Sequence, residues 1–138
     1  MGTRTKIEIG FNQINRLNEM DDLARLLFPH NKNHQKIFLA IFIELKYAEN
    51  QFLQNFGYIC NKYDISYRLL EVVRAKSRRM GIIDHVSKFN SKYGYREGWV
   101  FSKKFSCSLL KLGNTFNFHI ENKLGNQEQK DRDCFYYI

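Results

Sequence analysis

Residues 64–83, DISYRLLEVVRAKSRRMGII, join an amphipathic helix pattern to a concentration of positive charge. Ser66 is a favourable helix N-cap, and Gly81 stands where a left-handed residue commonly follows the last turn of a helix. We therefore predict a helix over residues 67–80. Four of the six residues at positions 74–79 are Lys or Arg, which suits contact with a polyanion but is also ordinary for a solvated helix face.

Two further helices are predicted before this stretch. Residues 34–48 are apolar almost all round, which indicates a helix buried in the middle of the domain, with Asn33 as its N-cap. Residues 50–61 are predicted to form a short helix, and a turn of about four residues connects it to the helix at 67–80. The inward face of the short helix would consist of Phe52, Leu53, Phe56, Ile59 and Cys60.

A β-hairpin is predicted after Gly81. Residues 82–90 and 95–101 alternate polar and apolar side chains on either side of a loop that contains Gly94. Trp99 and Phe101 are expected to be core residues. The chain therefore reads as helix, short helix, turn, helix and hairpin over residues 33–101, a mainly helical α+β fold.

Flanking elements are predicted at both ends. Residues 5–11 alternate like a short strand, and residues 12–28 have helical spacing that should stop before Pro29. Ser102 should cap a further helix that ends at Gly113. Residues 115–120 alternate like a strand. We expect one domain over residues 1–120, with its core at 33–101 and an N-terminal strand and helix extension, followed by a polar tail at 121–138.

The order of elements over residues 33–101 resembles the winged helix-turn-helix DNA-binding domain of bacterial and archaeal transcription regulators. Ile65 and Ser66 stand where such domains close the turn, and Gly81 with the two isoleucines after it leads into the first strand of the wing. The pattern departs from the family at Arg74 and Ser77, where apolar residues are usual. We expect the helix to bury Leu69, Leu70, Val73 and Met80 instead.

The resemblance implies a DNA-binding site. Residues 67–80 would be the recognition helix in the major groove, with Tyr67 and Arg68 near base edges, and the hairpin at 82–101 would be the wing. Glu71 would repel phosphate. The expected DNA-binding residues are Ser66, Tyr67, Arg68, Arg74, Lys76, Arg78, Arg79, Lys88, Lys92, Tyr93 and Arg96.

The distribution of charge agrees with a polyanionic partner. The net charge of the 138 residues is +8, and residues 62–104 hold eleven Lys or Arg against four Asp or Glu, a net charge of +7. The remaining 95 residues contribute only +1. Lys and Arg side chains that neutralise phosphates release counterions, which gives affinity that is independent of sequence and sensitive to salt.

Other classes of protein find less support. The three cysteines, Cys60, Cys107 and Cys134, show no metal-binding or disulfide spacing, so we expect a reduced, cytoplasmic protein. His30 and His34 are four apart, but no third ligand stands near them, and we predict no metal and no cofactor. The longest apolar run has seven residues, too short to cross a membrane. No catalytic constellation is visible, so we do not expect an enzyme.

The function expected from the sequence is binding of double-stranded DNA by a small transcription regulator, with sequence preference. It would act as a homodimer that pairs through residues 12–28 or 105–120, because each protomer would read one half-site. Two alternatives remain open. One is a winged-helix module for protein–protein interaction, and the other is a DNA-binding protein for replication or maintenance of a mobile element.

Overall fold

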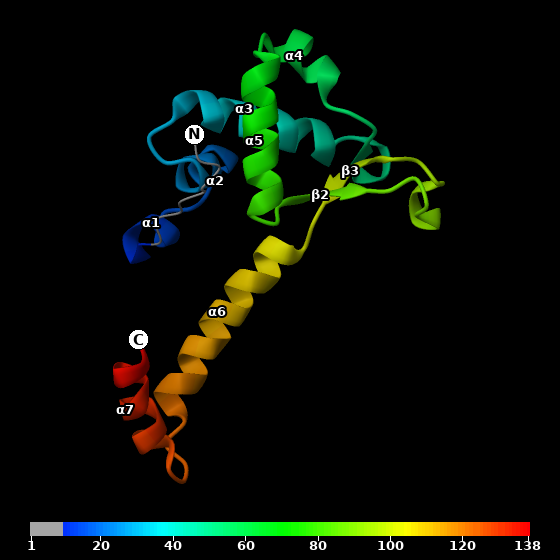
Figure 1. Cartoon of the computed structure of the whole chain (residues 1–138). Coiled ribbons are helices and arrows are strands. Elements are labelled where there is room, and N and C mark those ends of the chain that lie inside the picture. The colour runs from blue at the N-terminus through cyan, green and yellow to red at the C-terminus, as the bar shows by residue number, and fades with distance from the viewer. Residues whose placement is uncertain (1–9) are drawn as a thin grey trace. The chain divides into compact units, whose positions relative to one another are not determined.

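The computed structural model describes residues 10–138 and is a mainly helical α+β structure with a small antiparallel sheet (Figure 1). Residue contacts divide the chain into two compact units, one that ends at Lys104 and one that begins at Phe105. The helices are α1 (Phe11–Asn15), α2 (Met20–Leu27), α3 (Lys32–Lys46), α4 (Gly57–Tyr63), α5 (Tyr67–Arg79), α6 (Lys104–Glu121) and α7 (Gln127–Tyr137), and two 3₁₀ turns are η1 (Glu49–Gln51) and η2 (Ser91–Tyr93).

The core of the first unit lies around α3. This helix packs against both α2 and α5 and against α4. Its fully buried side chains are Ile37, Phe38, Ala40, Ile41 and Leu45. A helix that contacts neighbours on several sides needs apolar residues on most of its surface, which is the pattern that predicted its central position. The prediction is confirmed, although α3 begins and ends two residues earlier than expected and its N-cap is Asn31 instead of Asn33.

The sheet has three strands in the order β1–β3–β2, all antiparallel. They are β1 (Phe52–Leu53), β2 (Ile83–Val86) and β3 (Gly98–Phe101). The predicted hairpin is therefore confirmed, with Ile83 opposite Phe101 and Val86 opposite Gly98. The ring of Phe101 packs against Phe42 of α3 at 5.2 Å between centroids, which joins the sheet to the helical core. Gly81 has φ of +83°, as expected for the residue that ends α5.

Two of the expected helices differ from the structure. Residues 12–28 form two helices, α1 and α2, because Glu19 and Asp22 make reciprocal capping bonds that start a new helix. The second helix ends at Leu27, before Pro29, as predicted. Residues 50–61 do not form one helix. Phe52 and Leu53 pair with Val100 and Trp99 as strand β1.

The predictions for the C-terminal region are wrong. The Ser102 Oγ accepts the backbone N–H of Lys104 at 3.1 Å, although α6 begins at Lys104 and Ser102 stands one residue before the N-cap position. The helix continues through Gly113 to Glu121. The strand expected at 115–120 is part of this helix, and α7 occupies most of the segment expected to be a polar tail. The chain divides after Lys104 and not after residue 120. The strand expected at 5–11 lies outside the described residues except for Gly10 and Phe11, and Phe11 begins α1.

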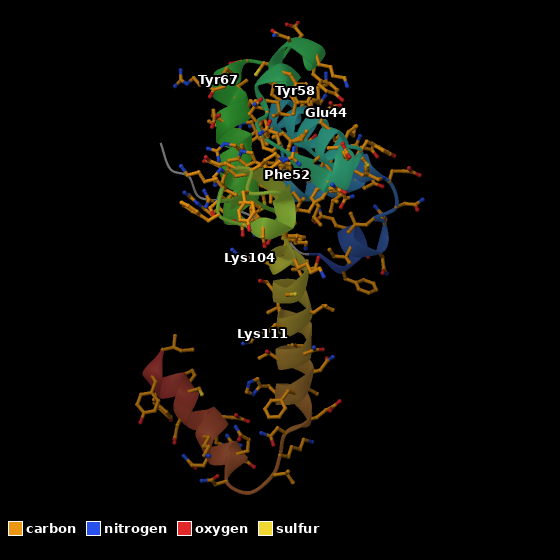
Figure 2. All side chains as sticks on the ribbon, turned by 90° about the vertical axis from the view of Figure 1, so that its right-hand side faces the viewer. Glu44, Phe52, Tyr58, Tyr67, Lys104 and Lys111 are labelled. Atoms are coloured by element: carbon orange, nitrogen blue, oxygen red, sulfur yellow. The ribbon has the colours of Figure 1, made fainter. Side chains whose placement is uncertain are left out.

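A carboxylate on α3 fixes the position of α4. The side chain of Glu44 is only 10% exposed and accepts hydrogen bonds from the Tyr63 hydroxyl at 2.7 Å and the Lys62 ammonium at 3.0 Å. These bonds, that of Tyr63 first, hold the pKa of Glu44 below its ordinary value. Burial and then the bond to Glu44 raise the pKa of Tyr58 to about 12. Figure 2 shows Glu44 and Tyr58 on these two neighbouring helices.

Replacing the carboxylate should destabilise the first unit in a manner that depends on pH. We expect Glu44→Gln to lower the free energy of unfolding by about 1–2 kcal/mol at pH 7, because hydrogen bonds to a charged acceptor are lost. A depressed folded-state pKa stabilises above the unfolded pKa, and this stabilisation disappears as the pH falls through the folded pKa. The difference from wild type should therefore shrink below the ordinary pKa of 4.5.

Urea denaturation at pH 7 and at about pH 3.5 measures this difference. Glu49→Gln is the matched control, because Glu49 is exposed on η1. A difference between wild type and Glu44→Gln that stays constant with pH would contradict the assignment.

Candidate nucleic-acid interface

Helices α4 and α5 are joined by a turn of three residues. Asp64 adopts a left-handed conformation with φ of +54°, and the N–H of Ile65 donates to the Cys60 carbonyl at 2.9 Å. Ser66 occupies the N-cap position of α5 in extended conformation, although its side chain makes no capping bond. The turn therefore ends where the sequence predicted, and the first two residues of α5, Tyr67 and Arg68, are exposed.

The buried face of α5 is narrow. Leu70, Val73 and Ser77 are almost completely buried, while Leu69 and Met80 are only partly buried. Of the four residues that α5 was expected to bury, Leu70 and Val73 are confirmed, whereas Leu69 and Met80 are only partly buried and Ser77 lies in the core. The Ser77 Oγ has no hydrogen-bond partner among residues 10–138. On the opposite face, Arg68 and Arg79 are exposed eleven residues apart, with Val72 between them.

The side chain of Arg74 points toward the sheet and not into solvent. Its Nε lies 2.8 Å from Glu71 Oε2, and its guanidinium lies 4.7 Å from the centre of the Trp99 ring. Glu71 also accepts a hydrogen bond from Tyr67, which raises the pKa of that phenol. The positive charge of Arg74 thus compensates the negative charge of Glu71 within α5. The repulsion of phosphate expected from Glu71 and the attraction of phosphate expected from Arg74 therefore cancel.

Arg78 and Lys76 leave α5 on opposite sides. The Arg78 guanidinium lies 5.7 Å from the Trp99 ring, and its Nε is 3.8 Å from Asp84, while its side chain stays about half exposed. The Lys76 ammonium lies 3.3 Å from Nδ1 of His34 on α3. Burial, and then the charge of Lys76, lower the pKa of His34, which keeps the imidazole neutral beside the lysine. The basic run 74–79 therefore does not form one face.

Trp99 organises a groove between α5 and the sheet. Phe56 stacks on its ring at 5.6 Å, and His85 meets it edge-on at 4.9 Å. The groove has a volume of about 490 Å³ and is lined partly by Tyr67 and Arg78. Trp99 is only partly buried, so it is not simply the core residue that the sequence predicted. Sequence reasoning missed this role because it depends on residues from four separate elements.

The loop of the β2–β3 hairpin presents the second group of cations. Lys88, Lys92 and Arg96 are exposed, and none of them forms an ion pair with another residue in the described part of the chain. Tyr93 stacks on Phe52 of β1 at 5.4 Å, and Arg96 lies 4.7 Å from the same ring. Phe52, which is labelled in Figure 2, therefore holds the loop against the sheet.

Gly98 allows Phe52 to occupy this place. A Cβ atom at Gly98 would lie 2.5 Å from Phe52 Cζ and 2.6 Å from the Leu53 carbonyl oxygen, both closer than atoms can approach. The sequence carries a signal here, since glycine within a strand often marks a close approach of another chain segment. The signal does not by itself identify the approaching segment, because Phe52 is predicted to lie on a helix.

The predicted site residues fall into two exposed groups and one inward group. Ser66, Tyr67, Arg68 and Arg79 are exposed on or next to α5, and Lys88, Lys92 and Arg96 are exposed on the hairpin loop. Tyr93 of the same loop is partly buried against Phe52. Arg74 and Lys76 form the inward group, because both are partly buried in contacts with neighbouring elements. Arg78 contacts Trp99 and Asp84 but keeps about half of its side chain exposed. The carboxylate of Asp84 accepts a hydrogen bond from the Lys104 ammonium at 2.9 Å, and this bond contributes most to the lowered pKa of Asp84.

The described residues offer no assembled metal site. No three His, Cys, Asp or Glu side chains gather in residues 10–138 as metal ligands would. His30 has a left-handed backbone conformation before α3, and Nδ1 of His34 lies 3.3 Å from the Lys76 ammonium. None of the helices over this range is both long enough and apolar enough to span a membrane.

Comparisons of the chain with protein-family models, with curated proteins and with solved structures find no match.

We expect Gly98→Ala to destabilise the first unit by about 1–3 kcal/mol, because Phe52 must move away from the added methyl group. The hairpin loop should become more mobile, because Tyr93 and Arg96 lose the ring they contact. Urea denaturation and amide hydrogen exchange of residues 88–96 measure the two effects. Gly57→Ala is the control, since its Cβ would meet only an ordinary contact at 3.7 Å. Equal effects of both substitutions would contradict the role of Gly98.

Proposed function

We propose that the protein is a winged helix-turn-helix protein that binds double-stranded DNA with sequence preference, as a small transcription regulator. In this proposal α5 enters the major groove and the β2–β3 hairpin contacts the neighbouring backbone as a wing. The observation that carries the proposal is that one unit holds both a helix with arginines at the two ends of its solvent face and a hairpin loop with three exposed cations.

The dimensions of α5 support this assignment. Its thirteen residues span about 20 Å, and the major groove of B-DNA, about 12 Å wide, admits one helix. Arg68 and Arg79 are separated by about 16 Å along the helix axis. Arg68 in the first turn can pair with guanine, and Val72 in the middle of the face can contact a thymine methyl group.

The cation–aromatic contacts of Arg78 also support the proposal. The side chain keeps about half of its surface in solvent while Trp99 and Asp84 restrict its orientation. A restricted arginine loses less conformational entropy when it binds phosphate. Arg74, which is bound to Glu71 and Trp99, is proposed to position Trp99 and the hairpin, with no direct contact to DNA.

A second candidate function is supported by an apolar groove between α3 and α5. The groove has a volume of about 440 Å³, and its lining includes the partly exposed side chains of Leu39, Ile43, Ile65 and Leu69. Such a surface suits a protein partner. A winged-helix interaction module would use it and would bind DNA weakly at any salt concentration.

Binding to duplex DNA should fall steeply with salt. If Arg78, Arg79, Lys88, Lys92 and Arg96 each neutralise one phosphate, the slope of log Kobs against log salt should be about −4 to −5. Affinity should therefore fall roughly 500-fold between about 50 and 200 mM salt. Fluorescence anisotropy with a labelled duplex measures this. Absence of binding at the lower salt concentration would support the interaction module instead.

Two substitutions separate backbone contact from base contact. Lys92→Ala should weaken binding to all duplexes alike and reduce the salt slope by about 1, whereas Arg68→Ala should reduce discrimination between sequences by about 1–3 kcal/mol. Both are measured against a site selected from randomised duplexes and a scrambled site. Lys123→Ala removes the same charge from the second unit and is the matched control. Identical behaviour of the Arg68 and Lys92 variants would overturn the orientation of α5.

A further inference from the structure

Helix α6 carries an apolar stripe that the rest of its own unit, residues 105–138, leaves uncovered. With 3.6 residues per turn, five large apolar side chains fall within about 80° of its circumference. No residue of α6 is buried, and four members of the stripe are 43–65% exposed. The stripe consists of Phe105, Leu109, Leu112, Phe116 and Ile120. Exposed apolar surface arranged as one continuous stripe marks an interface between helices.

The charge pattern favours a second copy of the chain as the partner. Lys111 is the one residue with a formal charge between Phe105 and Ile120, and helix geometry places it about 140° from the centre of the stripe. Residues 105–138 hold four Lys or Arg and four Asp or Glu, so their net charge is zero. Two copies can therefore approach stripe to stripe without repulsion, in contrast to the strongly basic residues 62–104.

Helix α7 does not have the surface needed to cover α6. Its polar side chains bond to one another along the helix: Arg132 pairs with Glu128 at 2.8 Å, and Gln129 donates to Asp133 at 2.8 Å. Its apolar residues are confined to the last positions, 134–137, and do not form a stripe along the helix. A membrane surface is also a poor partner, because helices that lie on membranes carry several Lys or Arg on the polar face.

Gly113 provides an independent observation. Glycine is the least favourable residue in a helix interior after proline, and a Cβ atom added at Gly113 would meet nothing within 4 Å. No contact within residues 105–138 therefore requires glycine at this position. Glycine in a helix permits close approach of a second helix backbone, and Gly113 lies at the edge of the stripe beside Leu112.

We propose that α6 is a homodimerisation helix whose stripe packs antiparallel against that of a second copy, with the two helices crossing at Leu112 and Gly113. Phe105 and Ile120 lie at equal distances from this midpoint, as do Leu109 and Phe116. In an antiparallel pair, Phe105 therefore packs against Ile120 of the other copy, and Leu109 against Phe116. Leu112 packs against the Gly113 backbone at the centre. Symmetric pairing of one surface with itself is the usual geometry of a homodimer.

The size of the stripe sets the expected strength. The exposed parts of its five side chains amount to about 500 Å² in each copy, so a pair would bury about 1,000 Å², near the lower bound of specific interfaces. We therefore expect a reversible dimer with a dissociation constant in the micromolar range. This inference does not rest on DNA binding, because it concerns a different unit of the chain.

Sedimentation equilibrium of the full chain without DNA tests the proposal. Leu112→Glu should raise the dimer dissociation constant at least about tenfold, because it places an unpaired charge in the interface. Leu110→Glu makes the same change on the same helix outside the stripe, and its effect should stay below about twofold. The two side chains are similarly exposed, at 58% and 66%. Circular dichroism verifies that both variants keep the wild-type helix content, and Leu112→Ala replaces Leu112→Glu if the glutamate variant unfolds.

The outcomes are distinct from those of the DNA experiments. A wild-type chain that stays monomeric over the micromolar range, or equal effects of the two glutamate variants, would overturn the proposal. A dimer that forms normally but does not bind DNA would leave it intact and would contradict only the proposed function.

The crossing point and the orientation have their own tests. Gly113→Ala should raise the dissociation constant about tenfold if the helices touch there, whereas Asn114→Ala, a similar gain in helix propensity off the stripe, should not. In a chain in which Cys60, Cys107 and Cys134 are serine, Leu109→Cys combined with Phe116→Cys should form a disulfide between copies. Leu109→Cys alone should not. A disulfide from the single variant would show a parallel dimer and overturn the antiparallel pairing.

Discussion

The arrangement of the first unit depends on the narrow face by which α5 packs against α3. Leu70, Val73 and Ser77 are the residues of α5 that are almost completely buried, and they follow the spacing of three and four that keeps side chains on one line of a helix. Every other residue of α5 must lie at an edge of this face or in solvent. This constraint sends Arg74 and Arg78 to the sheet and Lys76 to α3, and it leaves Arg68 and Arg79 outside.

Local sequence patterns were sufficient wherever the structure is decided by neighbours along the chain. The turn before Ser66, the end of α5 at Gly81 and the hairpin after it all follow from capping and periodicity, and all three predictions are confirmed in position. Strand β1 could not be predicted in this way. It has two residues and exists only because Phe52 and Leu53 pair with β3, more than forty residues away. Two residues with positive φ, Asn50 and Gln51, turn the chain toward that partner.

The C-terminal unit shows the opposite error, in which a local signal was given too much weight. Gly113 predicts a helix end, but an interior glycine costs only about 1 kcal/mol relative to alanine and does not by itself stop a helix. Phe116, Phe118 and Ile120 alternate like a strand, yet Phe116 and Ile120 also continue the stripe that begins at Phe105. Residues 105–138 contain no strand with which residues 115–120 could pair, and these residues are helical.

The candidate site was predicted better in its composition than in its geometry. The sequence pattern identifies the cations. It predicts that all cations of the run 74–79 contact DNA and that Glu71 repels phosphate. The ion pair between Arg74 and Glu71 and the contacts of Trp99 change both interpretations. Which member of a charged run is available depends on side chains from α3 and β3, and a one-dimensional pattern holds no information about them.

The division of surface between the two units has a consequence for affinity. Positive charge is concentrated in residues 62–104, whereas residues 105–138 have no net charge and expose the apolar stripe of α6. If both proposals hold, a dimer with two DNA-binding units binds a duplex with two half-sites more tightly than either unit alone, because the second contact is intramolecular. Linkage is reciprocal, so such a duplex must favour dimerisation by the same factor. A weak interface is then sufficient, because α6 needs to hold two copies together only where DNA has already brought them side by side.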